Sequence, residues 1–416
     1  MSLLIKNVIF EGKIIDIFVE NGRISKIKKN LNLRAKEKID AKGEKAVFPS
    51  FINCHTHSAM ILLRGFGEGL SLKDWLEKVI WKIEEKLDED DIYWGTKLAS
   101  LEMIRSGITT FNEMYFYPEA QIEATREIGL RAVLGLVLVD FSTKGCDKKT
   151  IEKIYPKLKT YLKNFPSIKL SIAPHAIYTV SKENLIWAKN FAKREKLLIH
   201  MHLSETEREV KDCQRKYKLR PVEYLEKIGF LNKNCVFAHS IWLSDKEIEI
   251  LAKRKCSLIY NPSSNMKLAS GIFPYKKAKE KGINVCLGTD GPASNNSLNF
   301  FFEMKIGSLL QKIKEKDPKI LPAKEAIEIA TKNGAKALKI NSGEIKVGKL
   351  ADLILVNLNK IPLFPKENLI SNLVFSANPD CVSDVICGGK ILMREGKIEN
   401  EEKIFTQAKQ KIKTSP

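Results

Sequence analysis

The chain has 416 residues, which is enough for one large domain with an accessory unit or for two to three ordinary domains. Hydrophobic residues make up 44% and charged residues 29%, as in soluble globular proteins, and no segment has the apolar length needed to cross a bilayer. The sequence shows no secretory signal, so we expect a cytoplasmic protein without a membrane partner. Its eight cysteines are scattered without a C-x-x-C pair, which indicates reduced thiols rather than a disulfide framework.

The formal net charge of +20 raises a nucleic-acid partner as one hypothesis. The lysines, however, fall on the polar faces of expected helices and in short terminal segments such as Lys26-Ile-Lys-Lys29, without interleaved aromatic residues. This pattern favours a generally basic surface over a binding stripe, so we expect no nucleic-acid partner.

Residues 1–48 carry short alternating strands with a hairpin signal at Glu20-Asn-Gly-Arg23, and they predict the N-terminal part of a small β domain. Over residues 49–345 apolar runs alternate with helix-length amphipathic segments. Eight buried strands with intervening helices predict an α/β fold, a (β/α)8 TIM barrel. The expected strands are 46–57, 108–114, 132–140, 169–175, 197–205, 235–240, 256–260 and 284–290.

Residues 346–416 return to short strands, expected at 351–356 and 385–393 with a turn at Gly388-Gly389. The simplest arrangement pairs them with residues 1–48, so that both ends of the chain form one small discontinuous β-sandwich domain beside the barrel. The polar segment 407–416 is expected to be frayed.

The apolar run that begins at Val47 ends in His55 and His57, which are spaced i, i+2 and therefore project from the same side of a strand. The chain has only six histidines, and all lie at or near the carboxyl ends of expected strands. Barrel enzymes build their sites at that face, so a shared site is favoured over six unrelated core histidines. The six are His55, His57, His175, His200, His202 and His239.

A zinc-type hydrolytic site uses a few histidine and carboxylate ligands and keeps one position open for water. His55, His57, one histidine of the fifth strand and Asp290 supply that set. His200 and His202 face one way, about 6.6 Å apart along the strand, and we favour His202 as the ligand because it is nearer the rim. No lysine or glutamate stands at the rim end of the fourth strand to bridge a second ion. We therefore expect one divalent metal per subunit, zinc first, although iron, manganese or cobalt suits the same ligands.

Glu205 and His239 remain as titratable groups at the same rim. A metal lowers the pKa of its bound water to about 7, and Glu205 fits the role of taking the water's proton and passing it to the substrate. His239 would orient the hydroxide and stabilise charge at the tetrahedral centre, and Asp290 could accept a hydrogen bond from the same water. The alternative for Glu205 is a solvated helix start, because Ser204-Glu-Thr-Glu207 is also typical of an N-terminal cap.

Several motifs together resemble the amidohydrolase superfamily, and within it the 5'-methylthioadenosine/S-adenosylhomocysteine deaminases, which include 5'-deoxyadenosine deaminase-like members. The resemblance covers nearly the whole chain. Its motifs are Pro49-Ser-Phe-Ile-Asn-Cys-His-Thr-His57, His202-Leu-Ser-Glu205, Phe237-Ala-His239, Asn261-Pro-Ser-Ser-Asn-Met-Lys-Leu-Ala-Ser-Gly271, Leu287-Gly-Thr-Asp-Gly-Pro-Ala-Ser-Asn-Asn296 and Gly343-Glu-Ile-Lys-Val-Gly-Lys-Leu-Ala-Asp-Leu-Ile354.

The resemblance implies hydroxide attack on C6 of an adenine ring, protonation of the ring nitrogen and loss of ammonia, in the salvage of S-adenosylmethionine by-products. Zinc nucleobase deaminases use a similar logic with a non-ligand glutamate. It also implies that His175 contacts the purine and that Trp75 and Glu84 lie near the ribose. The implied metal ligands are His55, His57, His202 and Asp290, with Glu205 as the proton carrier and His239 beside the attacking water.

Two positions depart from the family pattern. Lys82 stands where relatives often have proline, and nine residues of unbroken helix, about 900° of rotation, would place Trp75 and Glu84 on opposite faces. Both can face one pocket only if the segment bends; otherwise Trp75 belongs to an apolar helix face and Glu84 is a solvated charge. Near the end of the third strand, Leu136 stands where some relatives that hold a carboxylate use arginine.

The substitution at Leu136 favours substrates with a small or apolar 5' group, such as 5'-methylthioadenosine or 5'-deoxyadenosine, over S-adenosylhomocysteine. Lys144, Lys148 or Lys149 could instead supply the carboxylate contact. Other functions stay open at this point: a mononuclear amidohydrolase for guanine, a pterin or a triazine; a basic nucleic-acid-binding barrel; and a silent barrel with a structural metal. A homo-oligomer is compatible with the sequence.

Overall fold

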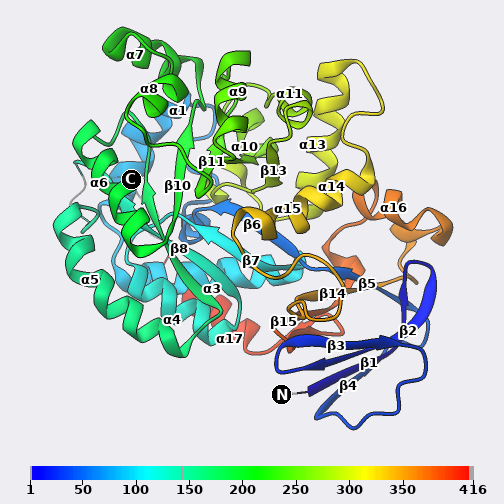
Figure 1. Ribbon diagram of the computed structural model, residues 1–416. Coiled ribbons are helices and arrows are strands. Elements are labelled where there is room, and N and C mark those ends of the chain that lie inside the picture. The colour runs from blue at the N-terminus through cyan, green and yellow to red at the C-terminus, as the bar shows by residue number, and fades with distance from the viewer. Residues whose placement is uncertain (1, 142–143, 412–416) are drawn as a thin grey trace.

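A computed structural model describes residues 2–141 and 144–411 (Figure 1). One of its two sheets is an eight-stranded parallel barrel in which the strands follow one another in chain order. The barrel is nearly closed, because Asp290 N, just beyond the last strand, donates to His55 O on the first at 3.0 Å. This confirms the predicted barrel. Its strands are β6 (Phe51–Thr56), β7 (Ile108–Glu113), β8 (Arg131–Leu138), β9 (Ile168–Pro174), β10 (Leu198–Leu203), β11 (Cys235–His239), β12 (Ser257–Tyr260) and β13 (Asn284–Leu287).

Helices surround the barrel and bury the outer faces of its strands (Figure 1). Several begin at a residue whose side chain accepts a backbone N–H of the first turn, as Ser181, Thr206 and Ser244 do for α6, α7 and α9. The surrounding helices are α3 (Glu89–Arg105), α4 (Pro118–Ile128), α5 (Lys148–Tyr161), α6 (Lys182–Glu195), α7 (Glu207–Tyr217), α8 (Pro221–Lys227), α9 (Asp245–Lys253), α10 (Pro262–Lys267), α11 (Tyr275–Glu280), α12 (Pro292–Asn295), α13 (Phe300–Glu315), α14 (Ala323–Ala330) and α15 (Lys332–Ala337).

A second, mostly antiparallel sheet combines strands from both ends of the chain, as predicted. It is joined where β14 pairs antiparallel with β5. The turn between β2 and β3 is the predicted hairpin, with positive φ at both Asn21 and Gly22, and Gly388-Gly389 makes the same kind of turn between β15 and β16. The strands are β1 (Ser2–Phe10), β2 (Lys13–Glu20), β3 (Arg23–Lys28), β4 (Glu37–Asp40), β5 (Lys45–Pro49), β14 (Leu353–Asn357), β15 (Val382–Cys387), β16 (Lys390–Arg394) and β17 (Lys397–Ile398).

The single strand expected over 46–57 is in fact two strands that belong to different sheets. Ser50 separates β5, which pairs with β14, from β6, which pairs with β7. Both halves are apolar because both are buried, so composition alone did not mark the break.

Shorter elements complete the chain. Between β6 and α3 lie η1 (Ser58–Leu63), α1 (Leu72–Trp75), the π-helix η2 (Leu76–Ile80) and α2 (Trp81–Glu84). The others are η3 (Leu162–Asn164), η4 (Ile361–Leu363), η5 (Lys366–Asn368), α16 (Leu369–Phe375), η6 (Pro379–Cys381) and α17 (Glu401–Lys409).

Helix α17 occupies the start of the segment expected to be frayed, while residues 412–416 lie outside the described residues. All eight cysteines are buried and remain thiols, as expected. In the described part of the chain, no helix combines the length and the apolar character that a membrane span requires.

A buried ion pair joins the barrel to the terminal sheet and gives a stability prediction. Arg131, at the start of β8, contacts Asp352 through Nε and Nη2 at 3.2 and 3.3 Å, and Gly388 N donates to the same carboxylate at 2.7 Å. Asp352→Ala leaves the Arg131 charge buried without a partner, so we expect the free energy of unfolding to fall by about 3 kcal/mol.

Denaturant unfolding at neutral pH measures this loss. The control is Glu226→Ala, which breaks the more exposed pair with Arg254 and should cost under about 1 kcal/mol. Equal losses in the two variants would contradict the argument.

Candidate active site

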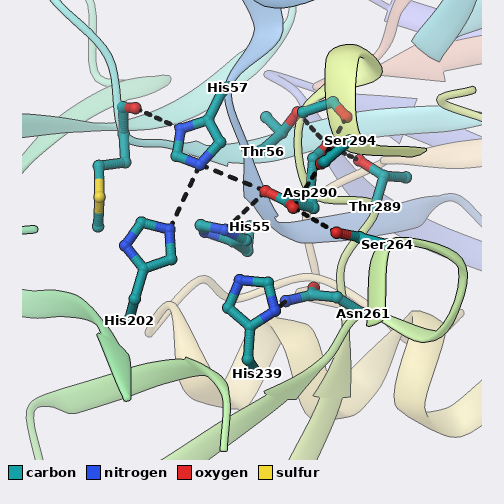
Figure 2. A network of polar contacts seen from close by, with 12 residues as sticks. His55, Thr56, His57, His202, His239, Asn261, Ser264, Thr289, Asp290 and Ser294 are labelled. Carbon is teal, nitrogen blue, oxygen red and sulfur yellow. Dashed lines mark hydrogen bonds and ion pairs between the residues drawn. The ribbon is translucent and has the colours of Figure 1, made fainter. Parts of the chain in front are cut away.

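Four side chains that can hold a metal ion meet at the carboxyl ends of the barrel strands (Figure 2). His55 lies on β6 and His57 just after it, His202 lies on β10, and Asp290 follows β13. One ligand atom from each of the four lies within 4.8 Å of all the others. The structure therefore brings together the four residues named as ligands from the sequence.

The distances between these atoms fit a single ion. Asp290 Oδ1 lies 3.1 Å from His55 Nε2 and 3.3 Å from His57 Nε2, and His202 Nε2 lies 3.4 Å from His57 Nε2. Atoms bound about 2.1 Å from one zinc-sized ion in tetrahedral geometry are about 3.4 Å apart. His55 Nε2 is also buried, and its contact with Asp290 lacks the geometry of a hydrogen bond. The donor set and its spacing thus fit a divalent metal.

The surroundings of each imidazole direct its Nε2 atom towards this centre. His57 Nδ1 donates to Met114 O at 2.6 Å, and His202 Nδ1 donates to His175 O at 2.9 Å. His55 Nδ1 lies 2.9 Å from Nε2 of His200, the deeper histidine of β10. Such partners fix the tautomer and orientation of a ligating histidine, and His200 is placed to support His55 rather than to reach the centre.

One carboxylate oxygen of Asp290 accepts hydrogen bonds from serines, and the other faces the histidines. Its Oδ2 accepts hydrogen bonds from Ser264 at 2.6 Å and Ser294 at 2.5 Å. Its backbone has a φ of +63°, and His239, on β11, has a φ of +67°. Left-handed backbone at non-glycine residues is strained and is common at functional sites.

The charges at the site are strongly coupled. Burial alone would lower the pKa of His57, but its hydrogen bond to the Asp290 carboxylate and that charge raise it to about 9. Burial lowers the pKa of His55 to about 3, even though Asp290 opposes the shift. The two histidines hold the pKa of Asp290 well below its usual range against the opposing effect of burial. In the metal-free site one proton therefore resides on His57.

Glu205 and His239 face each other beside this cluster. His239 Nε2 lies 3.7 Å from Glu205 Oε2, and both side chains are buried. His239 Nδ1 lies 2.9 Å from Asn265 Oδ1 and 3.4 Å from Asn261 Nδ2, and the shorter contact makes Nδ1 the donor. Burial raises the pKa of Glu205, a shift that the nearby His239 opposes. A carboxyl group that holds its proton more tightly than usual is suited to proton transfer near neutral pH.

A cavity of about 1050 Å³ opens above the cluster, and Trp75, Glu84 and His175 all line it. Trp75 and Glu84 can line one cavity only if the helical segment between them bends. The bend lies at the π-helix η2, in which Trp81 N donates to Leu76 O, five residues earlier. A π turn rotates less per residue than an α turn, so Trp75 and Glu84 come to the same side. Glu84 is buried rather than a solvated charge, whereas Trp75 both lines the cavity and packs in the apolar cluster of this segment.

Glu84 and His175 have altered acidities in this cavity. Burial raises the pKa of Glu84 to about 7, with Tyr115, His57 and Lys144 opposing the shift. Burial lowers the pKa of His175 to about 3, so its ring is neutral at physiological pH, and its Nδ1 lies 3.0 Å from Thr179 Oγ1.

The structure corrects the argument based on Leu136. Leu136 is buried in the main hydrophobic cluster and does not line the cavity, whereas Val137 and Val139 do. Alternation along β8 turns these two valines to the pocket. The wall at this point is apolar, but through residues other than the one inferred from the sequence.

Of the three lysines considered as carboxylate contacts, only Lys144 lines the cavity. Its Nζ donates to Glu85 O and Leu87 O at 2.8 and 2.7 Å.

Sequence reasoning missed several residues that hold the site. The serines and asparagines of the two polar motifs were quoted for resemblance, but their contacts to Asp290 and His239 appear only in the structure. Glu209 was not singled out, because an acidic residue in a first helical turn is ordinary. The missed residues are Ser264, Ser294, Asn261, Asn265 and Glu209.

A parallel barrel with three histidines and an aspartate at the carboxyl ends of its strands, beside a buried glutamate, is the architecture of a metal-dependent hydrolase. The model of the amidohydrolase family matches residues 46–392, and the chain belongs to that family.

Three comparisons show how similar the relatives are. The chain is 46% identical over 402 residues to a 5-methylthioadenosine/S-adenosylhomocysteine deaminase of Thermococcus sibiricus, covering 94% of each protein. It is 44% identical over 418 residues to a 5'-deoxyadenosine deaminase of Methanocaldococcus jannaschii, covering 98% of each. A zinc-bound crystal structure of an adenosine deaminase from Xanthomonas campestris superimposes with a TM-score of 0.93 at 31% identity, covering 98% of this chain and 97% of that one.

The proton on His57 makes metal binding depend on pH. Because this histidine is protonated below about pH 9 in the metal-free site, a divalent metal must displace its proton. We expect zinc binding at pH 7.5 to release about one proton per site and the affinity to fall about tenfold for each pH unit lowered. Calorimetry in buffers of different ionisation enthalpy counts the protons.

Asp290→Asn is the informative comparison, since it removes the charge that raises the pKa of His57 and should reduce proton release as well as affinity. Binding at pH 7.5 without proton release in the unmodified protein would contradict the assignment.

Proposed function

We propose that this protein is a metal-dependent hydrolytic deaminase that converts adenosine derivatives to the corresponding inosine derivatives and ammonia. The observation that carries the proposal is the position of Glu205 and His239, which face each other 3.7 Å apart beside a cluster suited to one metal ion. The names of the curated relatives support adenosine-type substrates. Zinc is the metal we propose, supported by the histidine-rich donor set and by the zinc-bound neighbour.

His55, His57, His202 and Asp290 would hold the ion, which would supply hydroxide at neutral pH by lowering the pKa of a water molecule. Glu205 accepts a proton from the attacking water and delivers it to the ring nitrogen next to C6. Its raised pKa lets it keep that proton between the two transfers. His239 stabilises the charge that develops on the oxygen at C6. The remaining hydroxyl proton passes to the amino group, the C6–N bond breaks to release ammonia, and a C6=O bond restores the planar ring.

The lining of the cavity can hold the rest of a nucleoside. Glu84 in its ionised form can accept hydrogen bonds from both ribose hydroxyls, and Trp75 offers an apolar surface beside it. The neutral ring of His175 can contact the purine without adding charge.

The 5' end of the nucleoside meets an apolar wall in this proposal. Val137 and Val139 line the cavity near Trp81 and Phe141, whose rings meet edge to face at 5.3 Å. Each lysine or arginine among the described lining residues already has a partner. Lys73 pairs with Glu77, Lys144 donates to two carbonyl oxygens, and Arg208 pairs with Asp212.

Ammonia release from metal-loaded protein tests the function. We expect turnover of 5'-methylthioadenosine, 5'-deoxyadenosine and adenosine, and a loss of at least about 100-fold in kcat with Glu205→Gln, which cannot carry the proton. Guanine is offered in parallel. Metal-loaded protein that deaminates guanine but no adenosine would overturn the proposal in favour of another heterocycle.

The apolar wall predicts the ranking of substrates. The charged amino-acid tail of S-adenosylhomocysteine would lie against valines without a partner, so we expect its kcat/KM to be at least about tenfold below that of 5'-methylthioadenosine. In the matched variant Val139→Arg, the guanidinium should pair with the tail's carboxylate. The kcat/KM for S-adenosylhomocysteine should then come closer to that for 5'-methylthioadenosine. Equal kcat/KM for the two substrates in the unmodified protein would show that the wall does not select.

A further inference from the structure

We infer that Glu209 is a positioning residue for catalysis, which fixes the backbone of Glu205 so that the Glu205 carboxylate faces His239. Its Oε1 accepts Ser204 N at 2.9 Å and its Oε2 accepts Glu205 N at 2.8 Å. Glu209 therefore binds the backbone of the proton carrier itself. The inference rests on the proposed function of Glu205.

These two contacts differ from ordinary helix capping. In a capping box the third residue of a helix accepts the N–H of the N-cap residue, as Glu247 does for Ser244 at the start of α9. The N-cap of α7 is Thr206, and its hydroxyl accepts Glu209 N at 3.2 Å. The Glu209 carboxylate passes over Thr206 and reaches the two residues before it. It therefore secures the loop after β10 rather than the end of the helix.

The cost of this arrangement also indicates a role beyond capping. Glu209 is buried, with 5% of its surface exposed, and among the described residues no lysine, arginine or histidine lies within salt-bridge distance of it. Burying a carboxylate without a cation is unfavourable, and a helix start can be capped by a neutral side chain instead. Groups that break a local rule at such a cost are typical of functional sites.

The opposite side of the same loop is fixed to the loop that follows His239. Ser204 O accepts both Ile241 N at 3.0 Å and Trp242 N at 2.9 Å, while Leu203 O accepts Ser240 N at 2.8 Å. The N–H groups of the segment thus bind Glu209, and its carbonyl groups bind the chain beyond β11.

Ser204 takes a left-handed φ of +49° at the centre of this network. The N–H of Glu205 is held by Glu209 at 2.8 Å, and the Glu205 carboxylate lies 3.7 Å from His239 Nε2. Without the Glu209 carboxylate the segment can relax, and a displacement of about 1 Å at a catalytic group can cost about 100-fold in rate.

The test compares Glu209→Ala and Glu209→Gln with Glu247→Gln, using metal-loaded full-length protein of verified metal content. Glu247→Gln is the control for changing a buried carboxylate at a helix start: Glu247 accepts Ser244 N and Val222 N at 2.9 and 3.1 Å and, unlike Glu209, also pairs with Arg220 at 2.6 Å. With 5'-deoxyadenosine we expect Glu209→Ala to lower kcat about 10- to 100-fold while KM stays within about threefold. Glu209→Gln keeps one acceptor oxygen and should lose less. Glu247→Gln should keep kcat within about threefold of the unmodified protein.

Two further readouts separate positioning from a general loss of structure. The affinity for a transition-state analogue with a tetrahedral, hydroxyl-bearing carbon at C6 should weaken in Glu209→Ala by the same factor as kcat/KM, while the affinity for the inosine product is unchanged. In a crystal structure of that variant, Glu205 Oε2 should lie farther than 3.7 Å from His239 Nε2.

The outcomes are distinct for the two ideas. A kcat for Glu209→Ala within about threefold of the unmodified protein, or an equal loss in Glu247→Gln, would overturn the positioning role. Unmodified protein that deaminates no adenosine would overturn the proposed function alone. In that case crystal structures of the unmodified protein and of Glu209→Ala decide the inference, and an equal distance between Glu205 Oε2 and His239 Nε2 in both would overturn it.

Discussion

The site depends on a buried negative charge. Asp290 lies at the barrel mouth with both oxygens in use, one towards two serine hydroxyls and the other towards two histidines. A carboxylate in such surroundings stays ionised only if cations or strong donors face it. In the metal-free protein that cation is protonated His57, and in the loaded protein it is the metal. The same charge therefore favours a cation beside it, whether that cation is the His57 imidazolium or a metal ion.

The need to surround the Asp290 charge with donors explains why the two polar motifs that contain Ser264 and Ser294 are buried at the site. Ser264 and Asn265 come from α10, and Ser294 from α12, yet their side chains all serve Asp290 or His239. A second buried carboxylate, Glu303, accepts Ser263 N at 3.2 Å and Asn295 Nδ2 at 2.9 Å, so it ties the two motifs together. Burial raises the pKa of Glu303 to about 7. The buried polar side chains around Asp290 thus have specific hydrogen-bond partners, as the side chains of a hydrophobic core have specific packing neighbours.

Much of this was predictable from the sequence because barrel strands give strong local signals. Apolar runs that end in histidine located the strands and their carboxyl ends, and i, i+2 spacing put His55 and His57 on one side. The predictions that failed depended on contacts between residues far apart in the sequence or on unusual backbone conformations. The break at Ser50 reflects pairing with β14, some 300 residues later, and the inward side of β8 was assigned one residue out of register.

The π-helix and Glu209 show a further limit of sequence reasoning. No residue between Leu76 and Ile80 signals a wider turn, since these residues suit an α-helix equally well. An acidic residue such as Glu209 is ordinary in a first helical turn. Only the path of the preceding loop brings the N–H groups of Ser204 and Glu205 to its carboxylate. Periodicity describes which side of an element is buried. It does not describe what a buried polar side chain will contact.

The residues proposed for the chemical step and those proposed for substrate selectivity lie on different parts of the structure. The groups proposed to act on C6 stand on or directly after barrel strands, where sheet hydrogen bonds hold them rigidly. The groups proposed to hold the ribose and the 5' end stand on the segment between β6 and α3, at the end of β8 and on the chain after it. Trp75 and Glu84 share one side only because of a single π turn, so a change in that turn would redirect one of them without moving a catalytic group. Substrate preference on this scaffold can therefore change through a short helical segment while the metal centre stays intact.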